Sequence, residues 1–232
     1  MQLLLMVSPR RMFCWMWGFL RARFLALCFF SLYVADVVSL VLGCGIGVHM
    51  CADDLQIYFS DCLVNVSSLT DRLMDCIVAV GGWLSVNQLK FNPRKTEFLW
   101  LGTGPLLKKM DAPTLLVDGV EVSPALTVRD LGVVLDGCLT MVPHINALCR
   151  CCFYQLRRLW SIRKSVPSDV MKTLVSAFVL SRLDYCNGLL YGVAEVALKK
   201  VQLFQNAAAR LVTGVGSLTI SHQYSGSFIG SL

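Results

Sequence analysis

In the central part of the chain, short apolar runs are separated by polar turns, a pattern typical of strands joined by hairpins. Residues 45–50 and 55–59 form two such runs, with the adjacent carboxylates Asp53 and Asp54 between them. This pattern predicts a hairpin that exposes both acids at its turn. Three further segments are predicted: a buried strand at 98–102, a hairpin with a tight Asp-Gly turn at 115–122, and a strand with its lead-in at 128–136.

Apolar residues that recur every three or four positions predict helices elsewhere. Residues 66–87 carry this repeat, and Ser67 or Ser68 can cap the start of the helix. Residues 143–213 carry it in three successive stretches, so three helices are expected there. Residues 215–232 are rich in Ser and Gly and are expected to fray. The sequence therefore predicts an α+β chain in which a helical bundle follows the strands.

Residues 1–50 are strongly apolar, but charged residues interrupt them. Arg21, Arg23 and Asp36 divide the apolar positions into short blocks. No uncharged run reaches the roughly 18–20 residues of a membrane-spanning helix. A membrane anchor formed by residues 12–43 is nevertheless kept as an alternative, which would make the chain a small membrane protein.

Charge is distributed unevenly along the 232 residues, of which 56% are hydrophobic and 16% charged. Residues 51–136 contain seven basic and eleven acidic groups, whereas residues 137–232 contain ten basic and three acidic groups, a net of +7. An acidic centre followed by a basic C-terminal part suits a metal site beside a region that binds a polyanion. Charge alone fits a solvated helical surface equally well.

The eleven cysteines are scattered without the spacing of a disulfide framework. This favours a reducing, intracellular compartment, the nucleus or the cytoplasm. Cys149, Cys151 and Cys152 lie close together, but no second Cys/His pair follows at the spacing of a zinc site. Thiols packed in or beside a helical core are the favoured interpretation.

The Asp53–Asp54 pair is the first candidate for chemistry. Carboxylate oxygens gathered at a turn suit Mg²⁺, which prefers hard oxygen ligands. In two-metal phosphoryl transfer, such ions activate the attacking oxygen and stabilise the leaving oxygen. Asp is also common in turns because its side chain bonds nearby backbone groups, so the pair alone leaves both interpretations open.

The sequence around this pair resembles that of reverse transcriptases. Residues 51–54, Cys-Ala-Asp-Asp, are similar to the Y-A-D-D box, with Cys51 in the place of Tyr. Residues 83–97 resemble the W-x-x-x-N-x-L-K-L-N-x-x-K-T-E segment of that family at fixed spacing. Three further segments are similar to elements of non-LTR, vertebrate LINE-type retrotransposons: V-x-x-L-G-V-x-L-D at 128–136, S-R-L-D-Y-C-N at 181–187, and Q-N-A-A-A-R-L within 202–211.

The resemblance covers roughly residues 24–213 and implies part of a right-hand polymerase. The implied organisation is a divergent apolar segment at 1–23, a partial palm with the Asp-Asp hairpin and a helix at 24–136, an α-helical thumb bundle at 137–213, and a flexible tail at 214–232. The implied activity is RNA-directed DNA synthesis with Mg²⁺. The implied partners are an RNA template and an RNA–DNA duplex.

The resemblance also implies site residues. Asp53 and Asp54 would be catalytic and would hold the metal, and Lys95 matches a family lysine that lies near the nucleotide phosphates. The outer faces of the thumb helices are basic and would meet phosphates, which give affinity without sequence information. The candidates for this contact are Arg157, Arg158, Arg163 and Lys164.

Two departures from the family concern catalysis. Residues 20–27 align with a P-Q-G-S-x-L-G-P box but lack its Pro, Gln and Gly residues. The family takes a third carboxylate from a strand upstream of that box, whereas the only acid before Asp53 is Asp36, which follows the box. Two carboxylates without the third leave the metal ions short of ligands. The expected function is therefore that of a truncated, catalytically incomplete reverse transcriptase; the alternatives are a nucleic-acid-binding module without chemistry and the membrane protein.

Overall fold

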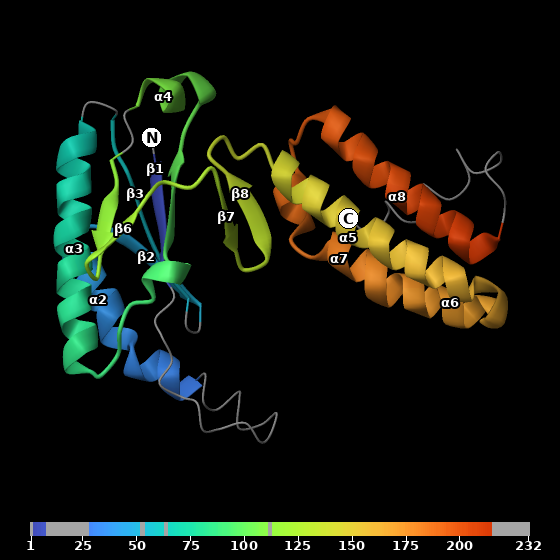
Figure 1. Cartoon of the computed structure of the whole chain (residues 1–232), viewed down its shortest axis with the longest axis horizontal. Helices are drawn as coiled ribbons and strands as arrows, with labels where there is room; N and C mark the ends of the chain where they lie inside the picture. Colours follow the sequence, from blue (N-terminus) through green and yellow to red (C-terminus); the bar gives the residue numbers. More distant parts are fainter. Residues whose placement is uncertain (1, 8–27, 52–53, 63–64, 111–112, 215–232) are drawn as a thin grey trace. The chain divides into compact units, whose positions relative to one another are not determined.

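The computed structural model describes residues 2–7, 28–51, 54–62, 65–110 and 113–214. The chain divides into two compact units (Figure 1). Unit 1 comprises residues 1–130 and 136–139, and unit 2 comprises residues 131–135 and 140–232. Unit 1 contains a sheet covered by helices, and unit 2 consists mainly of helices.

Unit 1 is built on a four-stranded antiparallel sheet with the strand order β2–β3–β1–β4. Its strands are β1 (Gln2–Val7), β2 (Gly47–Cys51), β3 (Asp54–Ser60) and β4 (Glu97–Leu101). β1 is central and pairs with β3 along one edge and with β4 along the other. β1 belongs to the segment 1–23 that the sequence analysis separated from the partial palm, and here it is part of the sheet. Its continuous apolar run has no alternation, and such a run can occur in a buried strand or a buried helix.

Two helices provide the rest of the unit 1 core. Residues 28–33 are helical and lead into α2 (Ala35–Gly43), and α3 (Val66–Val86) follows the β2–β3 hairpin. Buried side chains of α2, α3, β3 and β4 form one apolar cluster, which includes Val41, Leu73, Ile57 and Phe98. The order β1–α2–β2–β3–α3–β4 is the β-α-β-β-α-β arrangement, in which the central strands come from distant parts of the sequence.

The remainder of unit 1 consists of short elements: α4 (Gly104–Lys109), β5 (Leu115–Val117), β6 (Val120–Val122) and β7 (Thr127–Asp130). β5 and β6 pair across Asp118 and Gly119, which both have positive φ, so the predicted hairpin with an Asp-Gly turn is confirmed. The lead-in of the strand predicted over 128–136 is itself a strand, β7. Leu131 and Gly132 also have positive φ and reverse the chain between β7 and β8 (Val133–Asp136).

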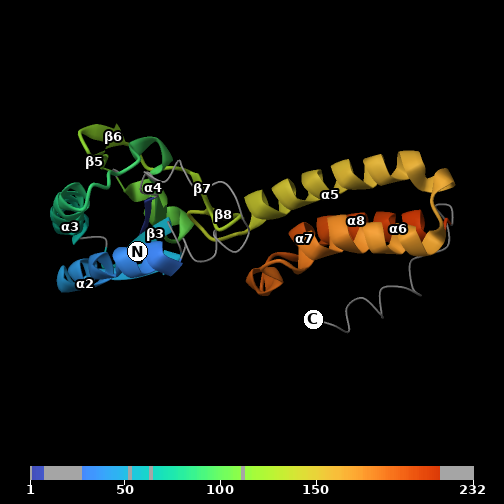
Figure 2. The ribbon, with the colours of Figure 1, turned by 90° about the horizontal axis from the view of Figure 1, so that it is seen from below.

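Unit 2 is a helical bundle, and the three predicted helical stretches are confirmed (Figure 2). The first is α5 (Val142–Ile162), which ends in the short turn η3 (Arg163–Ser165). The second runs from α6 (Ser168–Val175) through a π-helical turn, η4 (Ser176–Leu180), into α7 (Ser181–Asp184). The third is α8 (Glu195–Thr213), which follows the turn η5 (Asn187–Leu190). Their core includes Ile145, Met171, Val179 and Phe204.

The N-terminal segment considered as a membrane anchor is described only in part, because residues 12–27 lie outside the described residues. Within the described ranges, no helix has both the length and the apolar character needed to cross a membrane. The C-terminal residues 215–232, predicted to fray, also lie outside the described part of the chain.

Candidate functional site

The hairpin that carries the Asp-Asp pair has a two-residue connection. Cys51 at the end of β2 pairs with Asp54 at the start of β3, so only Ala52 and Asp53 lie between the strands. These two residues are outside the described part of the chain, whereas Asp54 is described and half-buried. The predicted hairpin is confirmed, and its register places Asp54 on the strand rather than in the connection.

The alternation of side chains along the hairpin separates core residues from candidate site residues. Val48, Met50, Leu55 and Ile57 belong to the core cluster with the helices. The intervening residues lie on the opposite face of the sheet: His49, Asp54, Gln56 and Tyr58. His49 and Gln56 are paired across the two strands. Polar groups therefore collect on the face that the helices leave open.

Asp130, the last residue of β7, lies against this face. The Gln56 amide Nε2 donates a hydrogen bond of 2.6 Å to Asp130 Oδ1, and Gln56 is 8% exposed. Burial raises the pKa of Asp130, and the charge of Asp54 raises it further. The hydrogen bond from Gln56 and the charge of His49 act in the opposite direction. Sequence reasoning missed Asp130 because 74 residues separate it from Gln56 and no spacing links the two.

The strand register shows which segments share the end of the sheet where Asp54 lies. β1 runs antiparallel to β3 and ends with Val7 opposite Leu55. β4 begins at Glu97, which is opposite Met6 of β1. The end of β1, the start of β4 and the β2–β3 connection are therefore at the same end of unit 1.

Lys95 lies immediately before β4, in the turn η2 (Pro93–Lys95), and is exposed. Buried Thr96 closes this turn, since its backbone N–H and its hydroxyl both donate to the Asn92 carbonyl at 3.0 Å. Asp54 at the start of β3 and Lys95 just before β4 thus belong to the same end of the sheet, and β1 separates β3 from β4. Two strand spacings are roughly 10 Å. The Asp54 and Lys95 side chains therefore come closer than their backbones only by extending toward one another.

Other residues of the 83–97 segment have structural contacts. The Tyr33 hydroxyl donates to the Asn87 carbonyl at 2.9 Å, and its ring centroid lies 6.4 Å from that of Trp83. The Asn87 side-chain amide donates to the Trp83 carbonyl at 2.8 Å, at the C-terminal end of α3. Trp83 and Asn87 therefore end α3 and hold the preceding helical segment against it.

The carboxylates near the hairpin do not complete a two-ion centre in the described part of the chain. Within the described ranges, no group of three or more His, Cys, Asp or Glu residues could hold a metal ion. Asp54 and Asp130 are near one another, while β1, which pairs with β3, contains no acid. Asp36 is exposed in the first turn of α2, not on the sheet. Asp53, the other candidate ligand, lies outside the described residues.

The four basic residues expected to meet phosphates have different environments. Arg157 and Arg158 are exposed on the last turns of α5, and Lys164 is exposed on η3. The Arg158 guanidinium lies 5.8 Å from the centroid of the Tyr154 ring, within the range of a cation–π contact.

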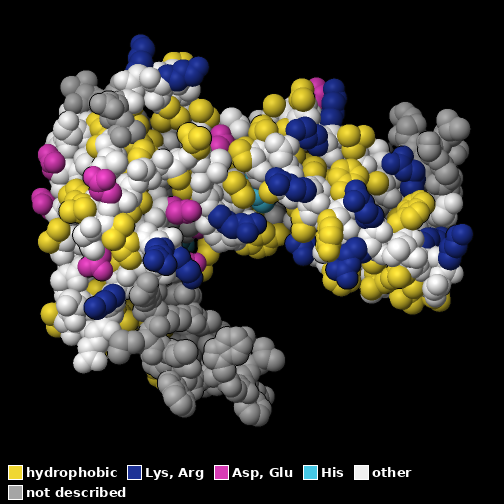
Figure 3. All heavy atoms as spheres, viewed as in Figure 1, with side chains coloured by type: hydrophobic (Ala, Val, Ile, Leu, Met, Phe, Trp, Pro, Cys, Tyr) yellow, Lys and Arg dark blue, Asp and Glu magenta, His cyan; other side chains and the backbone are white. Residues whose placement is uncertain are grey.

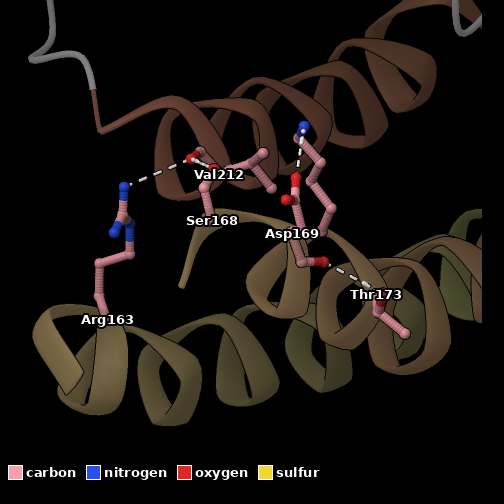
Figure 4. Close-up of polar contacts among 6 residues, drawn as sticks. Arg163, Ser168, Asp169, Thr173 and Val212 are labelled. Atoms are coloured by element: carbon pink, nitrogen blue, oxygen red, sulfur yellow. Dashed lines mark hydrogen bonds and ion pairs between the residues drawn. The ribbon is translucent and has the colours of Figure 1, made fainter. Parts of the chain in front are cut away.

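Arg163 has a structural role that the sequence analysis did not predict. Its Nε donates to the Leu211 carbonyl at 2.7 Å and its Nη2 donates to the Val212 carbonyl at 3.4 Å. Both carbonyls lie at the C-terminal end of α8, and Figure 4 shows Arg163 directed toward Val212. These carbonyls have no partner within the helix, and a cation there also interacts favourably with the helix dipole. Half-buried Arg163 therefore caps α8, and its side chain is not a free phosphate ligand.

The cysteines of α5 are core residues. Cys149 and Cys152 are buried in the unit 2 core, and Cys151 is half-buried beside them. Burial raises the pKa of the Cys152 thiol to about 12. Burial also raises the pKa of the Cys149 thiol, so Cys149 and Cys152 are protonated at neutral pH, as expected of packed core groups and not of metal-bound thiolates.

Comparison with known proteins gives one informative similarity. A protein of Drosophila melanogaster described as a probable RNA-directed DNA polymerase from transposon BS is 27% identical over 197 residues. The alignment covers 79% of this chain and 21% of that protein, so the chain spans about a fifth of the relative's length. No family model and no solved structure matches the chain. The similarity supports an origin in a reverse-transcriptase-like sequence.

Proposed function

We propose that the chain is a fragment of a non-LTR retrotransposon reverse transcriptase that binds nucleic acid and does not synthesise DNA on its own. In this proposal unit 1 is a partial palm and unit 2 is the thumb. The observation that carries the proposal is the β2–β3 hairpin, whose two-residue connection contains Asp53 and whose second strand begins at Asp54. Lys95, from the second motif, lies at the same end of the sheet.

The loss of catalysis follows from the place of β1. β3 has two edges, and they pair with β2 and β1. A third carboxylate delivered beside the hairpin would therefore have to come from β1, and β1 is Gln-Leu-Leu-Leu-Met-Val. A strand from elsewhere cannot pair with β3 without displacing β1. Asp53 and Asp54 are then left without the partner that two-ion catalysis requires.

The basic character of unit 2 supports the retained binding of nucleic acid. Residues 137–213 contain ten basic and three acidic residues. On the face seen in Figure 3, Lys and Arg side chains of unit 2 are distributed among apolar ones. Contacts of Lys and Arg with phosphates release counterions, so binding should weaken steeply as salt increases.

The test has two arms on the full chain. In the first, primer extension is measured on poly(rA)/oligo(dT) with Mg²⁺ or Mn²⁺, and no extension is expected with the parent or with Asp53→Asn. In the second, fluorescence anisotropy at two salt concentrations should show binding to an RNA–DNA hybrid that falls with salt. Extension that Asp53→Asn abolishes would refute the loss of catalysis, and failure to bind nucleic acid at low salt would refute the proposed function.

A further inference from the structure

The outward face of α5 differs in charge from the other helices of unit 2. Residues 142–165 contain five Lys or Arg residues and no acid. One exposed cation on each of α6 and α8 has a carboxylate partner, since Lys172 lies 3.2 Å from Asp169 and Lys199 lies 3.3 Å from Glu195. Lys200 of α8 donates instead to the Asn146 amide oxygen of α5 at 2.8 Å. No carboxylate of the described part of the chain forms an ion pair with Arg157 or Arg158. Arg157 and Arg158 are therefore available to an external anion.

Aromatic rings lie among these cations. Tyr154 is 57% exposed and Trp160 is 61% exposed. Each is three residues from Arg157, a spacing that makes side chains neighbours on a helix surface. We call Tyr154, Arg157, Arg158 and Trp160 the α5 surface. Leaving two large rings in water gains nothing for folding, whereas the apolar residues of α5 that do support the fold are buried in the unit 2 core.

The combination of cations and rings distinguishes between nucleic-acid ligands. A duplex offers phosphates, but its bases are already stacked on one another. An unpaired strand offers phosphates to Arg and the flat face of each base to an aromatic ring. An acidic protein partner would satisfy the cations and leave the stacking capacity of the rings unused.

We propose that the α5 surface binds an unpaired nucleic-acid strand, with Arg157 and Arg158 at phosphates and the Trp160 ring stacked on a base. The inference rests on the proposed function, because it requires that unit 2 binds nucleic acid. It adds which kind of strand is bound and which residues recognise that strand. Arg158, whose guanidinium lies over the Tyr154 ring, is positioned to reach a phosphate while Tyr154 supports it.

The test compares three ligands of similar length on the full chain by fluorescence anisotropy: oligo(dT), a strand in which every base is replaced by an abasic site, and an RNA–DNA hybrid. Trp160→Leu should weaken binding of oligo(dT) by about fivefold or more, the lower end for loss of one stacked base. It should change binding of the abasic strand and of the hybrid by less than twofold. Trp160→Phe, which keeps a ring, should recover most of the loss.

Tyr191→Leu is the matched control, because Tyr191 is 95% exposed in unit 2 but lies outside α5. It should leave binding of all three ligands unchanged. Arg157→Gln should weaken binding of all three, because each has a phosphate backbone. Circular dichroism of each variant establishes that the fold is retained.

Outcomes of this experiment separate the inference from the proposed function. If oligo(dT) and the hybrid bind but Trp160→Leu weakens both equally or neither, the stacking role is wrong and the proposed function stands. If the parent chain binds none of the three ligands, both are wrong. A parallel measurement uses vesicles of phosphatidylcholine and phosphatidylserine. If the chain binds these vesicles and none of the nucleic acids, and Trp160→Leu abolishes vesicle binding, the α5 surface is a lipid-binding face and the inference is overturned.

Discussion

Gln56 of β3 and Asp130 of β7 are joined by a hydrogen bond of 2.6 Å across 74 residues of sequence. Gln56 is the buried partner, and its amide would otherwise lack an acceptor. The bond fixes the end of β7 against the face of the sheet that carries Asp54 and His49. The Asp130 carboxyl group is thereby held in partly dehydrated surroundings close to the Asp54 carboxylate. Burial and the neighbouring charge both disfavour its ionised form and raise its pKa.

The raised pKa of Asp130 predicts how stability depends on pH. Its ordinary value is 3.8, and burial raises it in the folded chain. Between 3.8 and the raised value the folded state binds more protons than the unfolded state, so the free energy of unfolding falls as pH rises through this window. Asp130→Asn retains an oxygen acceptor for Gln56 and has no charge. We expect this variant to be more stable than the parent at pH 7.

Urea unfolding of both proteins between pH 3.5 and 7 measures this difference, which should grow through the window and then level off. Because Asp130 is only half-buried, solvent screens its charge, and we expect the gain in the free energy of unfolding to stay below about 1 kcal/mol. Asp130→Leu removes the acceptor and should be destabilising at every pH. A parent and an Asn variant with identical pH profiles would contradict the prediction.

Gly47 at the start of β2 is expected to tolerate no side chain. A Cβ atom there would lie 2.6 Å from Cε2 of the Tyr58 ring and 2.9 Å from the Tyr58 carbonyl oxygen. Gly47→Ala should reduce the free energy of unfolding by about 1–3 kcal/mol. Gly43→Ala is the control, since nothing lies within 4 Å of a Cβ there. Removing the ring as well, in Gly47→Ala/Tyr58→Ala, relieves only part of the conflict. Equal stability of the two Gly variants in urea would exclude this packing.

Leu131, in the β7–β8 turn, has φ +44°, a conformation that costs a Leu residue about 1–2 kcal/mol. Asn adopts it more readily, and Asn-Gly is the preferred pair for this type of turn. Leu131 is 43% exposed, so its replacement loses little burial. We expect Leu131→Asn to raise stability by up to about 1 kcal/mol, measured by thermal unfolding. Gly132→Ala, at φ +92°, should do the reverse. A destabilised Asn variant would show that the Leu131 side chain contributes more than its strain costs.

Arg163 and Arg157 should have separable roles although both are arginines of the same region. Arg163→Met removes the two donors that cap α8 at Leu211 and Val212, and should cost about 1–2 kcal/mol of stability. Arg163→Lys should not restore it, because one ammonium cannot replace two fixed donors. Arg157→Met should change stability by less than about 0.5 kcal/mol. Equal effects of the two Met variants in urea unfolding would disprove the capping role.

The hydrophobic pattern was sufficient to predict the local elements. The two apolar runs at 45–50 and 55–59 predicted the hairpin, and the repeat of three or four residues predicted α3 and the three helical stretches of unit 2. These elements form from side chains close in sequence that need one apolar face each, and that requirement is visible in the order of residues. The Asp118–Gly119 turn was likewise predictable, because few residues adopt positive φ readily.

The sheet order, the role of β1 and the environment of Asp130 depended on tertiary structure. Gln2–Val7 has no alternation that distinguishes a strand from a helix, and only its pairing with β3 and β4 makes it central. Likewise, Arg163 is one basic residue among several until the end of α8 is brought beside it. Pairing and capping join residues far apart in the chain. Their free energy depends on the distance and direction between groups in space, so the local order of residues does not specify them.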